Sequence, residues 1–268
     1  MGIFGVQEVL GALGVGAGEA LKTAISQPTY LPWLGYFDLI DQVDRFVLLD
    51  SVQFEKQSWQ QRNRIKTPAG LQWLTLPVMF RGRLGQQILG VEIRDPEFVR
   101  KHLRAVELNY RRAPFFEMYF PKLSQILQSC SSSALLVDLN IGIIRWLCSV
   151  LGIRTQILRS SQLNEKGRRS QLLVNICQAL SADLYLSPLG SSTYLLDDLS
   201  LFCHAGINVA FQHYEHPQYR QLFPPFLSHA SLLDLIFNEG ENSLAILRAG
   251  RRTPFIPSEI TAEIGVEV

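Results

Sequence analysis

The chain has 268 residues, of which 47% are hydrophobic and 18% are charged, and its formal net charge is +1. This length and composition are typical of one large globular domain with a substantial core, and they exclude a low-complexity chain. A net charge near zero argues against nucleic acid and anionic membranes as partners. The four cysteines include no Cys-x-x-Cys pair, which favours reduced, buried thiols in a cytoplasmic protein over a zinc site.

Residues 1–21 read as a leader that precedes the folded domain. They are apolar and rich in glycine, but they lack the basic start of a signal peptide. Glu8 and Glu19 interrupt them, which argues against a membrane-spanning helix. We expect this leader to be poorly ordered, followed by a single domain at 22–245 and a C-terminal tail at 246–268.

The first elements of the domain predict a βαβ unit. Residues 22–27 have the composition of a strand, and apolar residues in 31–44 recur at a helical period. The continuous apolar run at 45–54 is typical of a buried parallel strand. A strand at 71–80 can form a hairpin with the residues before it, and a strand at 88–93 follows a glycine-rich loop.

Helices then dominate the chain. Asp95-Pro96 predicts a helix start, with Asp as the N-cap and Pro at the first helical position, and helices are expected at 96–110, 114–129 and 133–151. Alternating elements follow, with strands at 154–158, 183–188 and 207–212 and helices at 166–181, 192–204 and 231–237. The predicted fold class is α/β: a Rossmann-like parallel sheet with helices on both faces and a mainly helical insertion at about 96–130.

The loop after the first strand has the features of a ligand-binding loop. Within ten residues it holds the substrate-binding candidates Gln27, Tyr30, Trp33, Gly35 and Tyr36. Ligands bind at the carboxyl ends of strands in open α/β sheets, and the N-terminus of the following helix suits a phosphate. The alternative is that the three aromatic side chains are core packing for this helix, which does not explain the glutamine.

A second candidate stretch, DSVQFEKQSWQQRNRIKT (50–67), follows the second strand at the same end of the sheet. Asp50 is the candidate carboxylate for catalysis or orientation. Cations beside an aromatic ring suit an anionic substrate. Arg64 is one such cation, and the substrate-binding candidates are Gln53, Lys56, Trp59, Arg62, Asn63 and Lys66. The alternative is a solvated basic hairpin.

The turn after the strand at 183–188 is the third candidate stretch. It contains Ser187, Gly190, Ser191 and Tyr194 as candidate contacts with a substrate. Its hydroxyl groups either help a helix N-terminus to bind phosphate or cap that helix. No Gly-x-Ser-x-Gly pattern surrounds these serines, so a serine nucleophile is the weaker interpretation.

The stretch QHYEHPQYRQLF (212–223) supplies two candidates for a general acid or base, His213 and His216, and we place His213 in the catalytic set. Tyr219 and Gln221 are expected to be further contacts. The His-x-x-His spacing does not indicate a metal site, because Pro217 predicts a loop there. Asp234, in the predicted helix at 231–237, is a polar exception whose simplest explanation is a cap or a solvated position.

The N-terminal βαβ unit distantly resembles the HxGH nucleotidylyltransferase superfamily. Trp33-Leu34-Gly35-Tyr36 stands at the position of the HxGH motif, with the glycine kept and both histidines replaced by aromatic residues. The resemblance implies a frame that binds a nucleotide-like or aromatic ligand. The replacements remove the groups that stabilise phosphate charge during adenylyl transfer in that superfamily.

Five longer motifs resemble the WbqC-like protein family over about 22–245: QPTYLPWLGYFDLI, FVLLDSVQFEKQSWQQRNRIK, DLYLSPLGSSTYL, AGINVAFQHYEHPQYRQLF and LSHASLLDLIFNEG. This resemblance implies a cytoplasmic group-transfer enzyme in the biosynthesis of surface polysaccharide or specialised metabolites. The expected substrate is anionic, either nucleotide-linked or a sugar, and acyl or aminoacyl transfer to an amino sugar is one such reaction.

The alternative is a non-catalytic protein that binds a nucleotide or nucleotide sugar on a degenerate nucleotidylyltransferase fold. The absence of an obvious nucleophile favours that binder, whereas the dense ionisable groups at 50–66 favour the enzyme. The sequence assigns no cofactor and no metal, and it leaves the donor, the acceptor and a homodimer open.

Overall fold

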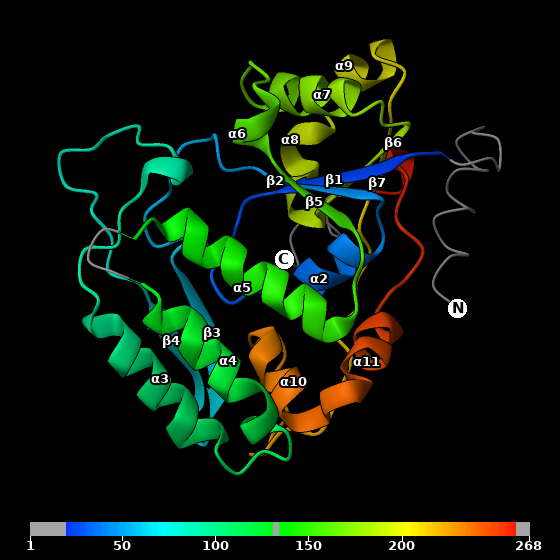
Figure 1. Cartoon of the computed structure of the whole chain (residues 1–268). Coiled ribbons are helices and arrows are strands. Elements are labelled where there is room, and N and C mark those ends of the chain that lie inside the picture. Colours follow the sequence, from blue (N-terminus) through cyan, green and yellow to red (C-terminus); the bar gives the residue numbers. More distant parts are fainter. Residues whose placement is uncertain (1–19, 131–133, 261–268) are drawn as a thin grey trace.

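A computed structural model of the chain describes residues 20–130 and 134–260 (Figure 1). Its main sheet consists of the parallel strands β1 (Lys22–Ser26), β2 (Arg45–Leu48), β5 (Gln156–Arg159), β6 (Leu184–Ser187) and β7 (Asn208–Phe211). They lie in the order β5-β2-β1-β6-β7, so the direction of winding reverses between β1 and β6. This doubly wound order confirms the predicted Rossmann-like sheet. The predicted leader falls almost wholly outside the described residues.

Helices cover both faces of this sheet (Figure 1). One face carries α6 (Ser160–Leu163), α7 (Ser170–Ala179), α8 (Ser192–Leu195) and α9 (Leu199–His204), and the other carries α2 (Leu34–Asp41) and α5 (Leu136–Leu151). Neighbouring strand residues therefore enter different cores: Ile25 and Val47 belong to one cluster, and Ala24 and Phe46 to the other. Burial on both faces explains why these strands read as continuous apolar runs.

A second unit lies between β2 and β5 in the chain. It contains an antiparallel ribbon of β3 (Arg62–Thr67) and β4 (Gly70–Thr75), a short 3-10 helix (Ile88–Gly90), α3 (Glu97–Tyr110) and α4 (Phe116–Gln128). The two helices confirm the predicted helical insertion. The strand expected at 88–93 is absent. Its buried residues Ile88, Val91 and Ile93 do not alternate as a strand requires, and the segment makes only isolated bridges.

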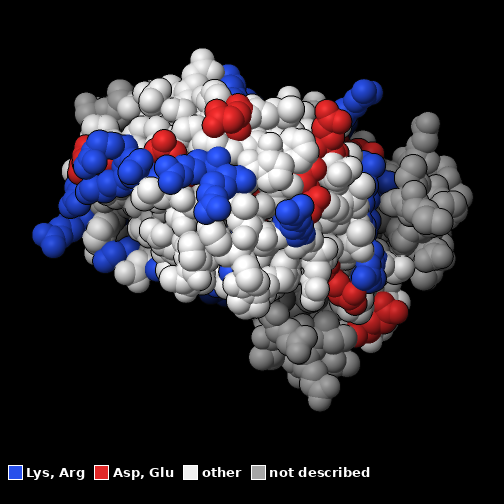
Figure 2. Space-filling model, turned by 90° about the horizontal axis from the view of Figure 1, so that it is seen from below, with Lys and Arg blue, Asp and Glu red and all other residues white. Residues whose placement is uncertain are grey.

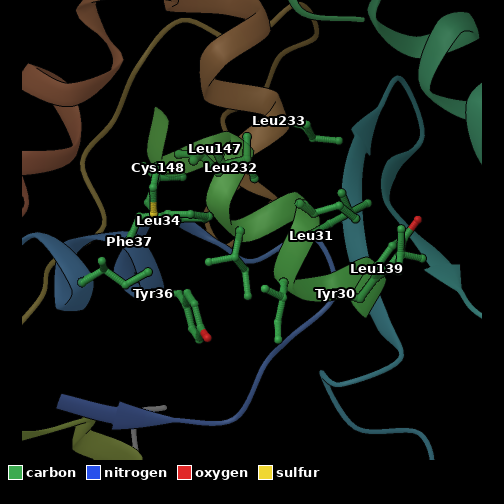
Figure 3. Packing of buried hydrophobic residues seen from close by; sticks show 14 of the residues in the cluster. Tyr30, Leu31, Leu34, Tyr36, Phe37, Leu139, Leu147, Cys148, Leu232 and Leu233 are labelled. Carbon is green, nitrogen blue, oxygen red and sulfur yellow. The ribbon is translucent and has the colours of Figure 1, made fainter. Parts of the chain in front are cut away.

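The first loop, α5 and α10 (Leu232–Glu239) join the two units through one apolar core (Figure 3). Leu31 and Leu34 pack there with Leu147 of α5 and with Leu232 of α10, and all four side chains are almost completely buried. The first loop is thus part of the framework that fixes the second unit against the sheet.

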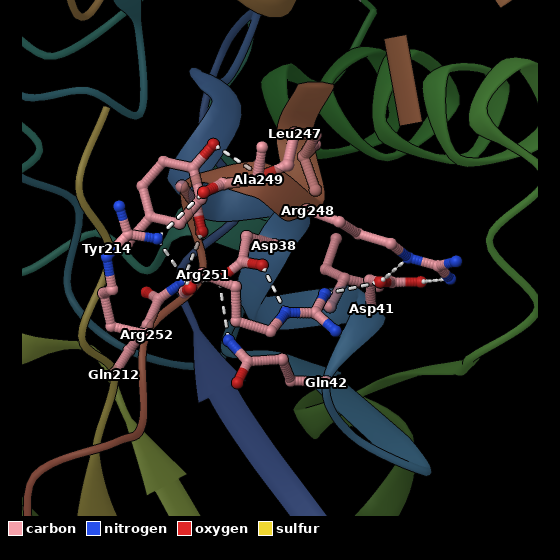
Figure 4. A network of polar contacts seen from close by, with 12 residues as sticks. Asp38, Asp41, Gln42, Gln212, Tyr214, Leu247, Arg248, Ala249, Arg251 and Arg252 are labelled. Atoms are coloured by element: carbon pink, nitrogen blue, oxygen red, sulfur yellow. Dashed lines mark hydrogen bonds and ion pairs between the residues drawn. The ribbon is translucent and has the colours of Figure 1, made fainter. Parts of the chain in front are cut away.

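The C-terminal segment folds back onto α2. It includes α11 (Ser243–Ala249) and a 3-10 helix (Pro257–Glu259), and the domain boundary predicted at 245 falls inside α11. Arg251 donates to the buried carboxylate of Asp38 at 2.8 Å and also pairs with Asp41, which Arg248 contacts from α11 (Figure 4). Burial raises the pKa of Asp38, although the charge of Arg251 opposes that effect.

Charge is unevenly distributed on the surface, although the net charge is close to zero. Figure 2 shows Lys and Arg side chains gathered on the left of the displayed face, the side on which α3 lies in Figure 1. Two of the four cysteines, Cys148 and Cys177, are buried. Cys203 is exposed and Cys130 is only half-buried, so the expectation of four buried thiols is wrong at Cys203 and met only in part at Cys130.

Candidate active site

The carboxyl ends of β1, β6 and β7 meet where the strand order reverses. Gln212, directly after β7, donates its backbone N–H to the carbonyl of Ser187 at 2.8 Å. Its side-chain Nε2 donates to the carbonyl of Gly35 at 2.9 Å and to Asp38 at 2.8 Å. This edge of the sheet is therefore held together by the protein's own amide groups.

The first loop brings Trp33 across Gly35. A Cβ atom at Gly35 would overlap the indole ring, so the glycine makes room for this tryptophan. The Tyr36 side chain is buried, and its hydroxyl donates to the carbonyl of Gln27 at 3.0 Å. Tyr30 is also buried and is hydrogen-bonded to Nδ1 of His102 at 2.9 Å. The geometry favours packing roles for both tyrosines.

Asp50 is completely buried between the ends of β2 and β5. Its carboxylate accepts hydrogen bonds from Arg159 Nε at 2.7 Å, from Ser160 Oγ at 3.0 Å, and from both the backbone and the hydroxyl of Ser161. Burial tends to raise the pKa of Asp50, but these hydrogen bonds hold it below its ordinary value. Such a carboxylate suits positioning better than proton transfer.

The second stretch meets the first loop. Gln60 donates to the side chain of Gln27 at 2.8 Å, and the N–H of Tyr30 donates to the carbonyl of Trp59 at 2.9 Å. Asn63 is buried and donates to the carbonyl of Tyr30 at 3.1 Å. The two loops thus lie side by side, supported by bonds between them.

Three other candidates of the sequence lie apart from this junction. Gln53 and Lys56 are exposed, and the Lys56 ammonium lies 4.2 Å from the centre of the Phe80 ring. His213 stacks on Phe255 with ring centres 4.2 Å apart and faces Glu215 at the surface. Lys56 and His213 therefore have local surface contacts of their own.

The third stretch stays near the β6 end. Ser187 is buried and donates to the carbonyl of Pro188 at 3.2 Å, while Gly190 and Tyr194 are exposed. Ser191 is the N-cap residue of α8, but its side chain makes no capping hydrogen bond. Among the described residues, no hydrogen bond, ion pair or ring contact joins 187–194 directly to the first two stretches.

Strand β3 carries the cations of the second stretch away from the sheet edge. Arg62, Arg64 and Lys66 alternate along it and share one face of the ribbon. The Arg62 guanidinium lies 4.4 Å from the ring centre of Trp73, and that of Arg64 lies 5.4 Å from the ring centre of Trp59. Neither arginine has a carboxylate partner within the part of the chain that the structure describes. We call Trp59, Arg62, Arg64 and Trp73 the Arg–Trp ribbon.

The Arg–Trp ribbon offers both charge and aromatic surface. Trp59 and Trp73 have ring centres 5.3 Å apart and remain 45% and 42% exposed. Large aromatic rings are normally buried, and guanidinium groups stack on aromatic rings and bind phosphate through paired donors. The arrangement can therefore hold an anion that carries a planar ring.

The row of cations ends in the interior at Lys66, which is only 1% exposed. Asp234 of α10 is completely buried nearby, and its Oδ2 accepts from the Tyr219 hydroxyl at 2.7 Å and from Gln221 at 2.8 Å. Burial raises the pKa of Asp234 above its ordinary value, although the Tyr219 hydrogen bond and the charge of Lys66 oppose that effect. No ion pair joins Lys66 directly to a carboxylate over the described ranges.

Two histidines, His216 and His229, lie beside Trp33. The rings of His216 and His229 lie 5.2 Å apart, and Trp33 lies 4.9 Å from His229 and stacks on His216 at 6.2 Å. Burial lowers the pKa of His216 to about 4. Burial and then the charge of Arg64 lower the pKa of His229. Both histidines are therefore neutral at pH 7.

We call the following six residues the β3 cluster: Arg64, Lys66, His216, Tyr219, His229 and Asp234. It contains three buried polar atoms that lack a hydrogen-bond partner: Nε of Arg64, Nε2 of His216 and Oδ1 of Asp234. The Tyr110 hydroxyl lies close enough to the Asp234 carboxylate to help lower its pKa, although no well-directed hydrogen bond reaches Oδ1. Buried polar atoms are normally satisfied, so this concentration indicates a place for a bound group.

The sequence analysis names several residues of the β3 cluster, but it does not predict that they come together. His229 was not singled out, and Asp234 was expected to be a cap or solvated, whereas it is completely buried. The available signal was the aspartate itself, an ionisable residue on the apolar face of a short helix.

The fold defines a doubly wound α/β protein of the Rossmann-like class. The chain matches the model of the WbqC-like protein family over residues 27–246, and it belongs to that family. It is also similar to "Uncharacterized protein Rv1507c" of Mycobacterium tuberculosis (strain ATCC 25618 / H37Rv), with 37% identity over 232 residues, which cover 86% of this chain and 99% of that protein. No solved structure matches the chain.

Within residues 20–130 and 134–260, none of the helices has the length and apolar character needed to cross a membrane. The same residues contain no group of three or more His, Cys, Asp or Glu side chains placed to hold a metal ion.

Proposed function

We propose that this protein is a cytoplasmic group-transfer enzyme that acts on an anionic substrate, either nucleotide-linked or a sugar, in the biosynthesis of surface polysaccharide or specialised metabolites. The observation that carries the proposal is the row of cations along β3, which runs from the exposed Arg–Trp ribbon to the buried Lys66. The ribbon binds the anionic, ring-bearing part of the substrate. The β3 cluster then surrounds the part that reacts.

The chemistry available in the β3 cluster supports group transfer. Asp234 is a buried carboxylate whose raised pKa brings it closer to neutral pH, as a general base requires. Tyr219 and Gln221 fix the orientation of its Oδ2, so the lone pairs of Oδ1 are the ones available to a substrate. Asp50 positions the ends of β2 and β5, and His213 is a surface residue outside the cluster.

The second candidate function is a non-catalytic binder of a nucleotide or nucleotide sugar. The replacement of the HxGH histidines favours it, because the half-buried Trp33 covers Gly35 and Tyr36 is buried where that superfamily places phosphate-binding groups. The binder would use the Arg–Trp ribbon in the same way. It would produce no chemical change in the ligand.

The first test is a thermal-shift screen of nucleotides and nucleotide sugars with the native protein, Arg62→Ala and Arg104→Ala. Arg104 is an exposed arginine of α3, so its replacement is the matched control. A ligand of the ribbon raises the melting temperature of the native protein and of Arg104→Ala, and the shift is reduced in Arg62→Ala. A shift that is equal in all three proteins would remove the ribbon from the proposed site.

The second test separates the enzyme from the binder. Each compound that binds is incubated with the native protein and with candidate acyl and aminoacyl donors, and its mass is followed by mass spectrometry. A new product that requires the protein supports group transfer. Complete recovery of every bound compound supports the binder.

A further inference from the structure

The relation between Lys66 and Asp234 is unusual for two buried opposite charges. Both side chains are almost completely buried, and the charge of Lys66 acts on Asp234, yet the two groups form no direct ion pair. Buried charges are normally paired and hydrogen-bonded, because each loses its hydration. Here no carboxylate of the described residues pairs with the ammonium of Lys66, and Oδ1 of Asp234 is a buried atom without a well-directed donor.

The two groups come from different elements, and each element contributes one sign of charge. Strand β3 contributes the positive side through Lys66 and, two residues earlier, Arg64, whose Nε is also unpartnered. Helix α10 contributes the negative side through Asp234. The neutral rings of His216 and His229 lie beside them and add no competing charge.

We propose that Lys66 and Asp234 form a recognition pair for a small molecule in which an amine lies close to a carboxylate or phosphate. The anionic group accepts hydrogen bonds from Lys66 and Arg64, and the amine donates to Oδ1 of Asp234. Free amino acids and amino-sugar phosphates share this chemistry. The proposal rests on the proposed function for the identity of the β3 cluster as a substrate site, and it adds that the substrate held there carries an amine.

A ligand that carries both an amine and an anionic group would provide partners for more of these polar atoms than a neutral ligand would. An alcohol or an uncharged sugar could donate to Asp234, but it would leave the buried ammonium of Lys66 without a counter-charge. A simple anion would pair with Lys66 and Arg64 and would bring a negative charge towards Asp234, which costs energy in a buried site. Only a molecule with both groups matches the two sides at once.

The test measures binding by calorimetry and thermal shift with the dialysed native protein. The probes are the twenty amino acids, phosphoethanolamine and glucosamine 6-phosphate, each beside its N-acetylated form. The variants are Asp234→Asn and Lys66→Met, which keep the approximate shape of the side chain and remove its charge. Their matched controls are Asp197→Asn and Lys101→Met, at exposed positions.

We expect at least one probe to bind, its N-acetylated form to bind weakly or not at all, and both cluster variants to raise the Kd about 10- to 100-fold, the usual range for a lost hydrogen bond to a charged group. The two control variants should bind as the native protein does. Amino acids and amino-sugar phosphates are separate arms of the panel, so the arm that binds identifies the source of the amine.

Three results would overturn the proposal: no probe binds, an N-acetylated probe binds as well as its parent, or binding survives in both cluster variants. The comparison with N-acetylated probes uses only native protein, so the test holds even where a variant does not fold. Nucleotide binding without any amine probe would refute this proposal alone. Amine binding without any nucleotide would refute the nucleotide-linked substrate and leave the recognition pair in place.

Discussion

His102 makes folding stability depend on pH in a way that can be calculated. It lies on α3, is 6% exposed, and is hydrogen-bonded through Nδ1 to the buried hydroxyl of Tyr30 at 2.9 Å. Burial lowers its pKa from 6.5 to about 4; a hydrogen bond with the Thr75 backbone opposes this effect, and the charge of Lys101 adds to it. The imidazole is therefore neutral in the folded protein at pH 7.

The sign and size of the effect follow from the two pKa values. Because the folded-state pKa is depressed, the unfolded chain binds a proton first as the pH falls, and stability is lost between 6.5 and about 4. Each unit of pKa difference corresponds to about 1.4 kcal/mol, so the full loss is about 3 kcal/mol. By pH 5 the loss is about 2 kcal/mol, which is a large part of the stability of a typical domain.

The assay is urea denaturation of the native protein and of His102→Gln at pH 7 and pH 5. Glutamine keeps a polar partner for Tyr30 but does not titrate. The native protein should lose about 2 kcal/mol more than the variant between the two pH values, since the other ionisable groups are common to both. Equal losses in the two proteins would refute the neutral, buried state of His102 and its role in holding the first loop.

Two further predictions concern positions described above, each with a matched control. Gly35→Ala should displace the indole of Trp33 and lower the melting temperature, whereas Gly142→Ala inside α5, where the nearest atom lies 3.9 Å from the added Cβ, should be neutral or stabilising by up to about 1 kcal/mol. A lower stability of Gly142→Ala than of Gly35→Ala would contradict the packing described for the first loop. Arg251→Met should cost about 3–5 kcal/mol in urea unfolding, because it leaves a buried carboxylate of α2 without its ion-pair partner. Arg252→Met removes an exposed ion pair and exposed hydrogen bonds to two backbone carbonyls, and it should cost less than about 1 kcal/mol. Similar losses in these two neighbours would show that the network on α2 contributes no special stability.

The parallel sheet could be predicted from the sequence because its strands are short apolar runs buried on both faces. Residues 45–48 and 184–187 have this character, and the helices between the strands carry a clear period. The prediction of a strand at 88–93 was wrong because apolar residues alone do not distinguish a strand from an irregular buried segment. Its burial comes from packing against parts of the chain that are distant in sequence.

The site was predictable in its loops and not in its interior. That the first two stretches meet follows from their shared place at the ends of parallel strands. The influence of the Lys66 charge on the buried Asp234 depends on how α10 packs against β3, which no local pattern reveals. For the same reason, the sequence could not decide between His213 and His216 as the histidine of the site. The two residues are close in sequence, but one stacks on Phe255 at the surface and the other faces Trp33.

The anchoring of α2 by the C-terminal segment also bears on how the chain folds as it is synthesised. Asp38 belongs to the first helix of the sheet, and its ion-pair partner Arg251 follows 213 residues later. Until that arginine emerges, the carboxylate has no counter-charge in the place where the fold buries it. The first βαβ unit therefore cannot reach its final stability early in translation, and its completion waits for nearly the last residues of the domain. A nascent chain released before Arg251 would carry every strand of the main sheet and still lack the ion-pair partner of the buried Asp38.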